Sequence, residues 1–235
     1  WVCLLALGIF AGTAFGAVAE PRVVASIKPV HSLVAGVMDG IGTPLLILGG
    51  AGSPHSYSLK PSQAAEIQDA DLIFWVGPEL ESFLEDPLQT IGAGATIVEL
   101  LEAPGIARLA LREGGLFEAH EHDGGHEDHD KTGEDGHHEE IDAHIWLDPQ
   151  NAAAMVSRIE AALAAADPAN AQRYAANAAT LRARLDALIT EIDQTIRPVR
   201  GKSFIVFHDG YQYFEERFGV AAAGFAGHDL WRGER

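Results

Sequence analysis

Short apolar runs alternate with amphipathic segments along the first hundred residues of the chain. Runs rich in β-branched and aromatic residues predict buried strands, and apolar positions that recur every three or four residues predict helices between them. Strands that alternate with helices are typical of parallel βαβ units, whose functional sites gather in loops at the carboxyl ends of the strands. The strands are expected at 23–27, 44–48, 72–76 and 96–99, and the helices at 30–38, 62–69 and from residue 79 onward.

Helical spacing dominates the second half of the chain. An alanine-rich helix is predicted at 151–166, and Asp167 and Pro168 are of the types that cap and begin a second helix, which continues to about Ile196. This helix would be about 43 Å long, which is more than a small domain requires. Because a new strand is predicted at 203–207, the long helix is expected to join two lobes.

The fold class predicted from this pattern is α/β, with two βα lobes of parallel sheet joined by a long backbone helix and the second lobe truncated in this chain. We expect an N-terminal metal-binding lobe at 20–150, a helical region at 151–200 and the start of the second lobe at 201–235. Apolar surface on the long helix and on 203–207 should then be exposed.

Residues 1–19 form an uncharged apolar leader that ends in Ala17-Val18-Ala19. Small residues at such positions are typical of the end of a secretory signal peptide, which predicts export to the periplasm and no stable membrane insertion after its removal. A membrane anchor is the alternative, and glycines at 8, 12 and 16 argue against it. The single cysteine, Cys3, lies in this leader, so disulfides and iron–sulfur clusters are excluded from the mature part.

Negative charge is concentrated in one segment. The chain has a net charge of −18, which argues against nucleic-acid binding because the phosphate backbone is negative as well. Residues 118–142 combine eleven acids with one lysine and hardly any apolar side chains, so we expect a mobile loop there. It is either a solvated insertion or a low-affinity zinc collector that feeds a tighter site. Its six histidines are His120, His122, His126, His129, His137 and His138.

Three other histidines lie where α/β sheets place their sites. His55 comes shortly after the predicted strand 44–48, His144 lies where apolar sequence resumes, and His208 directly follows the strand 203–207. Each alone is more often a structural histidine, but their shared placement indicates a common site. Neutral imidazole suits borderline cations such as Zn²⁺, and three imidazoles leave one coordination position for a carboxylate or water.

A secreted zinc hydrolase is a second interpretation of such a site, because zinc acidifies bound water. The usual enzyme motifs HExxH and GxSxG are absent, as is a glycine-rich phosphate cradle. A third interpretation is an adhesin-like surface protein, which would need an anchoring signal that the sequence does not show.

The segments VVASIKPVHSLV, PHSYSLKPS, HIWLDPQNA and GKSFIVFHDGYQYFEERFG, in this order, resemble the periplasmic zinc-binding proteins of ABC importers, the cluster A-I metal-binding solute-binding family. The resemblance runs from about residue 22 to 225. It implies that His55, His144 and His208 bind the metal between two lobes. It also implies a non-enzymatic protein, monomeric when full length, that captures Zn²⁺ and delivers it to an inner-membrane ABC permease.

Manganese-selective relatives usually carry a carboxylate where His208 stands and lack a long His/acid loop, so the resemblance favours zinc over a Mn²⁺ or Fe²⁺ carrier. One departure concerns the fourth ligand: some members have a glutamate immediately before the first histidine, where this chain has Pro54. The fourth position is therefore expected to be water, a loop group or a residue outside this chain.

The remaining candidates are interpreted as structural. His31 is expected to be an ordinary helix histidine, and His228 in the terminal segment incidental. The residues Glu79, Glu81 and Glu85 are expected on a solvated helix face, with docking to a permease as the secondary interpretation. Phe74, Trp75 and Trp146 are expected in the core, and Tyr57, Tyr211 and Tyr213 either over the cleft or in packing.

Overall fold

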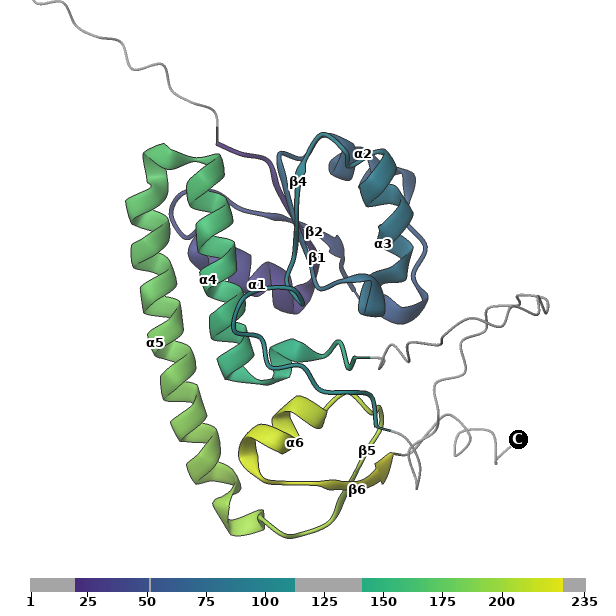
Figure 1. Ribbon diagram of the computed structural model, residues 1–235, viewed down its shortest axis with the longest axis vertical. Coiled ribbons are helices and arrows are strands. Elements are labelled where there is room, and N and C mark those ends of the chain that lie inside the picture. The colour runs from purple at the N-terminus through teal and green to yellow at the C-terminus, as the bar shows by residue number, and fades with distance from the viewer. Residues whose placement is uncertain (1–19, 51, 113–140, 226–235) are drawn as a thin grey trace, which may run out of the picture.

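The computed structural model describes residues 20–50, 52–112 and 141–225 (Figure 1). The predicted leader 1–19, the six histidines of the acidic segment and His228 lie outside the described residues. No helix in these ranges combines the length and the apolar character that crossing a bilayer requires.

A four-stranded parallel sheet forms the first half of the molecule. Its strands are β1 (Val23–Ile27), β2 (Leu45–Leu48), β3 (Leu72–Trp75) and β4 (Thr96–Glu99). They are ordered β2-β1-β3-β4, with Val24 paired to both Leu45 and Ile73. Every neighbouring pair is parallel, which confirms the predicted βαβ arrangement.

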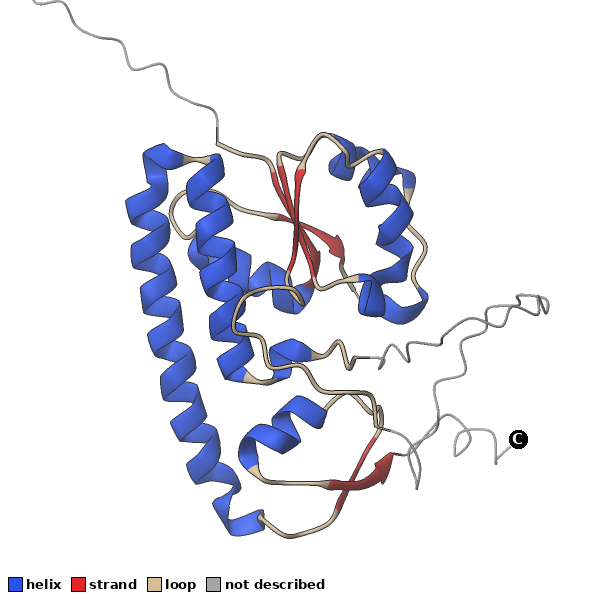
Figure 2. Ribbon diagram, viewed as in Figure 1, coloured by secondary structure: helices blue, strands red, loops and turns tan. Residues whose placement is uncertain are grey.

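Helices cover both faces of this sheet (Figure 2). Strand residues alternate between two apolar clusters, as the period-two geometry of a strand demands. Leu72 and Phe74 belong to the cluster that faces α1 (Lys28–Val37), whereas Ile73 and Trp75 belong to the one that faces α2 and α3. α2 spans Pro61–Gln68 and α3 spans Pro78–Thr90.

The helix starts differ slightly from the prediction. The first helix was expected at residue 30, but α1 begins at Lys28 and includes Pro29. Proline is compatible with a first helical turn because the N–H that it lacks would have no partner inside the helix. The same holds for Pro61 and Pro78, which open α2 and α3 one residue earlier than predicted.

Two helices pack side by side in the second half (Figure 1). α4 (Pro149–Ala166) is capped by Asp148, whose carboxylate accepts from the N–H of Gln150 at 2.8 Å. α5 (Ala171–Ile196) is 26 residues long, so the predicted long helix is present. Its expected capping residue is wrong, because the 3₁₀ turn η3 (Pro168–Asn170) intervenes. Asp167 instead accepts from Asn170 Nδ2 at 2.7 Å and from the Tyr174 hydroxyl at 3.1 Å.

A second, two-stranded sheet follows α5. The chain passes through the 3₁₀ turn η4 (Arg197–Val199) into β5 (Phe204–Val206), α6 (Gln212–Phe218) and β6 (Ala222–Phe225). β5 and β6 are parallel, so this is another βα unit, and β6 was not predicted. The predicted α/β class is thus confirmed.

Apolar side chains at this end of the molecule are exposed, as expected. Ile205 is 70% exposed and Phe207 is 85% exposed, and Leu188 on α5 is exposed as well. Within α5 itself only Tyr174 and Ala178 are buried, and both lie in its first third.

Candidate metal centre

His55 is held beyond the carboxyl end of β2. It lies in the 3₁₀ turn η1 (Pro54–Ser56), and the Ser53 hydroxyl accepts from the His55 N–H at 3.3 Å. η1 packs against α3, and the ring of Tyr57 meets the edge of Phe83 from that helix at a centroid distance of 5.2 Å. The turn is therefore fastened to the first sheet through α3.

His144 is oriented by a buried carboxylate. It precedes the 3₁₀ turn η2 (Ile145–Leu147) and is half-buried. Oδ1 of Asp142, which is 1% exposed, lies 2.7 Å from His144 Nδ1 and also accepts from the His144 backbone N–H at 2.9 Å. A carboxylate at this distance keeps the proton on Nδ1, so the lone pair of Nε2 is available to a cation.

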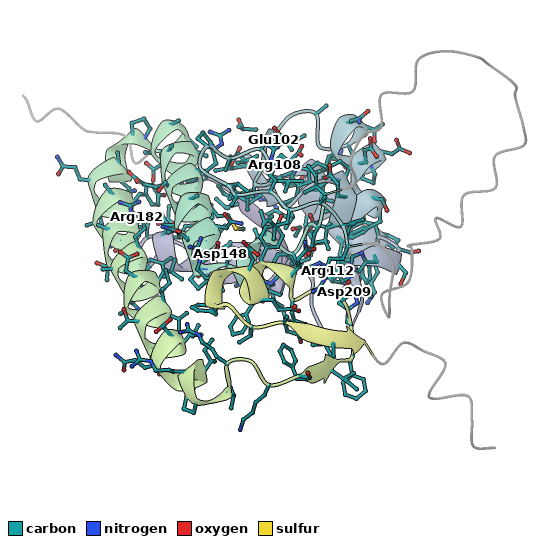
Figure 3. All side chains as sticks on the ribbon, turned by 60° about the horizontal axis from the view of Figure 1, so that its bottom comes forward. Glu102, Arg108, Arg112, Asp148, Arg182 and Asp209 are labelled. Carbon is teal, nitrogen blue, oxygen red and sulfur yellow. The ribbon has the colours of Figure 1, made fainter. Side chains whose placement is uncertain are left out.

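His208 follows β5, and its neighbour is tied to the first half of the chain. Arg112 forms ion pairs with Asp209 and with Glu215 of α6, the latter at 2.7 Å (Figure 3). These two carboxylates raise the already high pKa of Arg112 against the opposing effect of its burial, so the guanidinium stays charged. The loop that carries His208 is thereby held against residues that precede the acidic segment.

The three imidazoles converge on one point. His55, His144 and His208 each offer a ring nitrogen, and these nitrogens all lie within 4.8 Å of one another. Nε2 of His144 and Nε2 of His208 are 3.1 Å apart. Two ligands of a tetrahedral Zn²⁺ with Zn–N bonds of about 2.0–2.1 Å would lie about 3.3 Å apart. The His144–His208 pair has nearly this spacing, and the nitrogen of His55 lies within 4.8 Å of both.

Gly210 leaves room for this convergence. A Cβ atom at this buried position would lie 3.0 Å from Cδ2 and Nε2 of His144 and 3.0 Å from Cδ2 of His208. A larger side chain would push the two rings apart.

An aromatic side chain borders the site. The ring of Trp146 lies 5.4 Å from that of His144, and Trp146 is half-buried against the core. Phe74 and Trp75 are core residues, as predicted.

Sequence reasoning singled out the three histidines that the structure brings together, but it missed the residues that hold them. Asp142, Arg112 and Gly210 were not singled out. Only Asp142 carried a recognisable signal, because an aspartate two residues before a candidate ligand can reach its ring. Arg112 is 97 residues from Asp209, a separation that gives no local pattern.

The prediction that Glu81 faces solvent is wrong. The backbone of α3 departs from helical geometry at this residue, and the carboxylate folds back so that Oε2 accepts from the N–H groups of Val76 at 2.7 Å and Gly77 at 3.3 Å. Burial raises the pKa of Glu81 to about 7, against the lowering effect of these hydrogen bonds. Glu79 and Glu85 are exposed, as expected.

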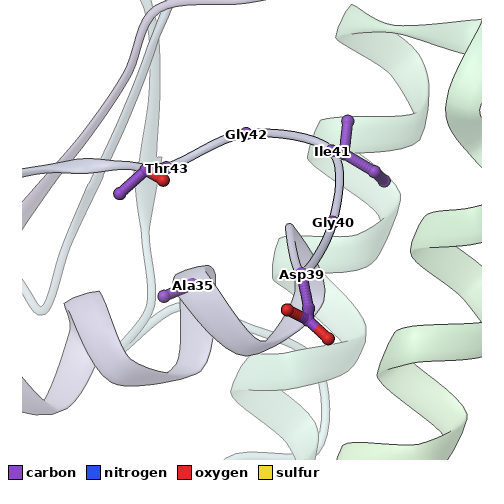
Figure 4. Close-up of a pocket in the computed structure, with 6 residues that line it drawn as sticks. All are labelled: Ala35, Asp39, Gly40, Ile41, Gly42 and Thr43. Atoms are coloured by element: carbon purple, nitrogen blue, oxygen red, sulfur yellow. The ribbon is translucent and has the colours of Figure 1, made fainter.

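The other candidates have structural environments. Nε2 of His31 lies 3.0 Å from the carbonyl oxygen of Pro44, which is the role of an ordinary helix histidine. A shallow pocket of about 400 Å³ lies along the segment from Ala35 to Thr43 (Figure 4). No histidine lines it, so it is separate from the cluster.

Comparison with known proteins gives a consistent picture. The family model "ZnuA: Zinc-uptake complex component A periplasmic" matches residues 23–229. A "High-affinity zinc uptake system protein ZnuA" of Brucella abortus (strain 2308) is 48% identical over 240 aligned positions, which cover 94% of this chain and 72% of that protein. The protein of the same name from Paracoccus denitrificans is 42% identical, with coverage of 86% and 65%.

The fold is similar to that of solved structures. The Zn(II)-bound ZnuA-like domain of Streptococcus pneumoniae AdcA superposes with a TM-score of 0.69 at 20% identity, covering 89% of this chain and 68% of that one.

Proposed function

This chain belongs to the family of periplasmic zinc-uptake components, and from that premise we propose that it captures Zn²⁺ in the periplasm and delivers it to the inner-membrane permease of an ABC importer. The observation that carries the proposal is the convergence of three imidazole nitrogens within 4.8 Å. The ion is cargo, which is bound and released without a chemical reaction.

The ligand set favours zinc over manganese. Neutral imidazole nitrogen suits Zn²⁺, whereas Mn²⁺ is better matched by carboxylate and carbonyl oxygen. Among the described residues, the group with metal-binding geometry consists of histidines alone. A water molecule is proposed to complete the tetrahedron, because the residue before His55 is Pro54, which has no donor atom in its side chain.

Capture and release are proposed to depend on which part of the fold carries each ligand histidine. His55 is carried by the loop after β2 of the first sheet, whereas His144 and His208 lie in the part of the molecule that packs around η2 and α6. An ion that bonds to all three holds these parts together. Separation of the two parts on docking to the permease would remove one ligand and weaken the site, so the ion could be passed on.

The experiment is a zinc titration of the purified chain by calorimetry, with a competing chelator to reach high affinity. We expect one tight site that is lost in His55→Ala, His144→Ala and His208→Ala, and retained in His31→Ala. Tight binding of all three variants would overturn the proposal. Competition dialysis of Zn²⁺ against Mn²⁺ tests the choice of metal, and turnover of ester or peptide substrates would favour the hydrolase interpretation.

The acidic segment is proposed as a low-affinity collector, with His120, His122, His126, His129, His137 and His138 as its ligands. Tethered imidazoles raise the local concentration of Zn²⁺ near the tight site. Deleting residues 121–139 should remove weak zinc sites from the titration and leave the tight site intact. Weak sites that persist unchanged in the deletion variant would contradict the collector role.

A further inference from the structure

The hydroxyl of Tyr213 bridges two segments of backbone. Tyr213 lies in α6 and is almost fully buried. Its hydroxyl donates to the carbonyl oxygen of Asp142 at 2.8 Å and accepts from the N–H of Leu109 at 3.0 Å. Leu109 and Asp142 are joined to each other as well, because the Asp142 N–H donates to the Leu109 carbonyl at 2.9 Å. One phenol therefore holds both sides of this two-segment junction.

The junction is linked to His144 through Asp142. Asp142 accepts the hydrogen bond from the Tyr213 hydroxyl through its backbone carbonyl, and its carboxylate orients the imidazole of His144. Any shift of the Asp142 backbone relative to α6 would move this carboxylate and the ring that it holds.

α6 is also linked to His208, which lies shortly before it in the chain. Tyr213 follows His208 by five residues, and the intervening Asp209 is held by Arg112, which also pairs with Glu215 in α6. α6 and the His208 loop are thus fastened as one unit. Tyr213 hydrogen-bonds this unit to Asp142, the residue that supports His144.

We propose that the Tyr213 hydroxyl is a positioning group of the metal centre, which sets the separation between His144 and His208 by tying α6 to the backbone of Asp142. This inference rests on the proposed function, since it concerns the same ion. Tyr213 itself does not touch the ligand nitrogens; it acts through Asp142 on one side and through the start of α6 on the other.

A packing role alone does not account for the hydroxyl. Phenylalanine would fill the same space, and a buried hydroxyl is costly unless it is hydrogen-bonded. Here both its donor and its acceptor functions are used. Burial raises the pKa of Tyr213 to about 12, so the proton needed for donation to Asp142 is present at physiological pH.

The test compares Tyr213→Phe with Tyr174→Phe in the full chain. Tyr174 is a matched control, because it is also fully buried and its hydroxyl donates to a carboxylate, that of Asp167, at the junction of α4 and α5. We expect Tyr213→Phe to lower zinc affinity about tenfold, as is typical when a group that supports metal ligands is removed. Tyr174→Phe should stay within about twofold of the unmodified chain.

A second readout separates positioning from general weakening. Co²⁺ bound to the site has a visible absorption spectrum that reports ligand geometry. Tyr213→Phe should change this spectrum, and Tyr174→Phe should not. Equal zinc affinities in the two variants together with identical Co²⁺ spectra would overturn the proposal.

The outcomes also distinguish this inference from the proposed function. If the unmodified chain binds no zinc, the proposed function itself is wrong. If it binds zinc and Tyr213→Phe matches it in both zinc affinity and Co²⁺ spectrum, only the positioning role fails. Should Tyr213→Phe not fold by itself, both variants are titrated in sucrose, which favours compact states.

Discussion

At the scale of single residues, the candidate centre depends on side chains that hold its ligands. Asp142 is buried, and its carboxylate makes two hydrogen bonds to His144, one with the ring and one with the backbone. A ligand that is oriented before the ion arrives loses less rotamer freedom on binding, which favours affinity.

Asp142→Asn tests this orientation. The amide has the size of the carboxylate but a weaker acceptor, and it can turn its NH₂ group towards Nδ1, which would favour the wrong tautomer. Zinc affinity measured by chelator competition should fall about 10- to 100-fold. Asp186→Asn, on the exposed face of α5, is the control and should bind like the unmodified chain.

Glu81 provides a test through stability. Its pKa is raised from 4.5 to about 7 by burial, so the folded state binds more protons than the unfolded state between these values. Stability contributed by this group is present in full below about pH 4.5 and decreases as the pH rises to about 7. The residue therefore destabilises the fold at neutral and alkaline pH.

Glu81→Gln should remove this dependence, because an amide does not titrate and its oxygen can still accept from Val76 and Gly77. In urea unfolding, the variant should be more stable than the unmodified chain by about 1–3 kcal/mol at pH 8. At pH 5 the difference should be about a quarter of its value at pH 8, because the folded-state carboxyl is then almost fully protonated. Glu85→Gln, exposed on the same helix, should change little at either pH. A gain that is equal at pH 5 and pH 8 would contradict the prediction.

At the scale of elements, α6 is attached to the start of α4 by an ion pair. Arg217 donates through Nε and Nη2 to the two carboxylate oxygens of Asp148, at 2.7 and 2.6 Å. This pair raises the pKa of Arg217. Asp148 is nearly buried and also caps α4, so one carboxylate serves both elements (Figure 3).

Arg217→Met should release α6 and leave the charge of Asp148 without its main partner. Loss of one member of a largely buried pair costs about 3–5 kcal/mol, and the partial exposure of Arg217 lowers this to about 2 kcal/mol. Chemical denaturation measures the loss. Arg182→Met, which breaks the more exposed 3.4 Å pair with Glu160, should cost under about 1 kcal/mol. Equal losses in the two variants would show that the Asp148 pair has no special role.

At the scale of the whole molecule, the first sheet is well covered, and among the described residues the second sheet has exposed apolar side chains. Helices pack on both faces of the four-stranded sheet, whereas β5 presents Phe204 and Ile205 to solvent next to Phe207. Contiguous exposed apolar side chains promote association.

Ile205→Thr should therefore reduce self-association of this chain without loss of zinc binding. Threonine keeps the β-branched shape that a strand favours and removes apolar surface. Light scattering at increasing protein concentration measures the effect, and chelator competition measures the affinity. An unchanged association profile would mean that this surface is not what brings molecules together.

The local pattern of apolar and polar residues was enough to predict most helices and strands. The strands Val23–Ile27 and Thr96–Glu99 have the predicted bounds, and the other two strands of the first sheet lie within one residue of theirs, because short β-rich runs between turn residues leave few alternatives. β6 was missed, since three of its four residues are alanine or glycine, which have weak β-propensity, and the strand forms by pairing with β5.

What the sequence determined by itself was the βα order, the long helix and three candidate ligand histidines, of which His55 and His208 follow strands and His144 precedes a 3₁₀ turn. Those features arise from periodicity and spacing, which are properties of neighbouring residues. Tertiary structure decided which side chains support the histidines and where Glu81 points. Arg112 reaches Asp209 and Tyr213 reaches Leu109 across about a hundred residues, and Glu81 turns inward at a kink in α3. Such contacts come into being only when the backbone closes on itself, so no local pattern encodes them.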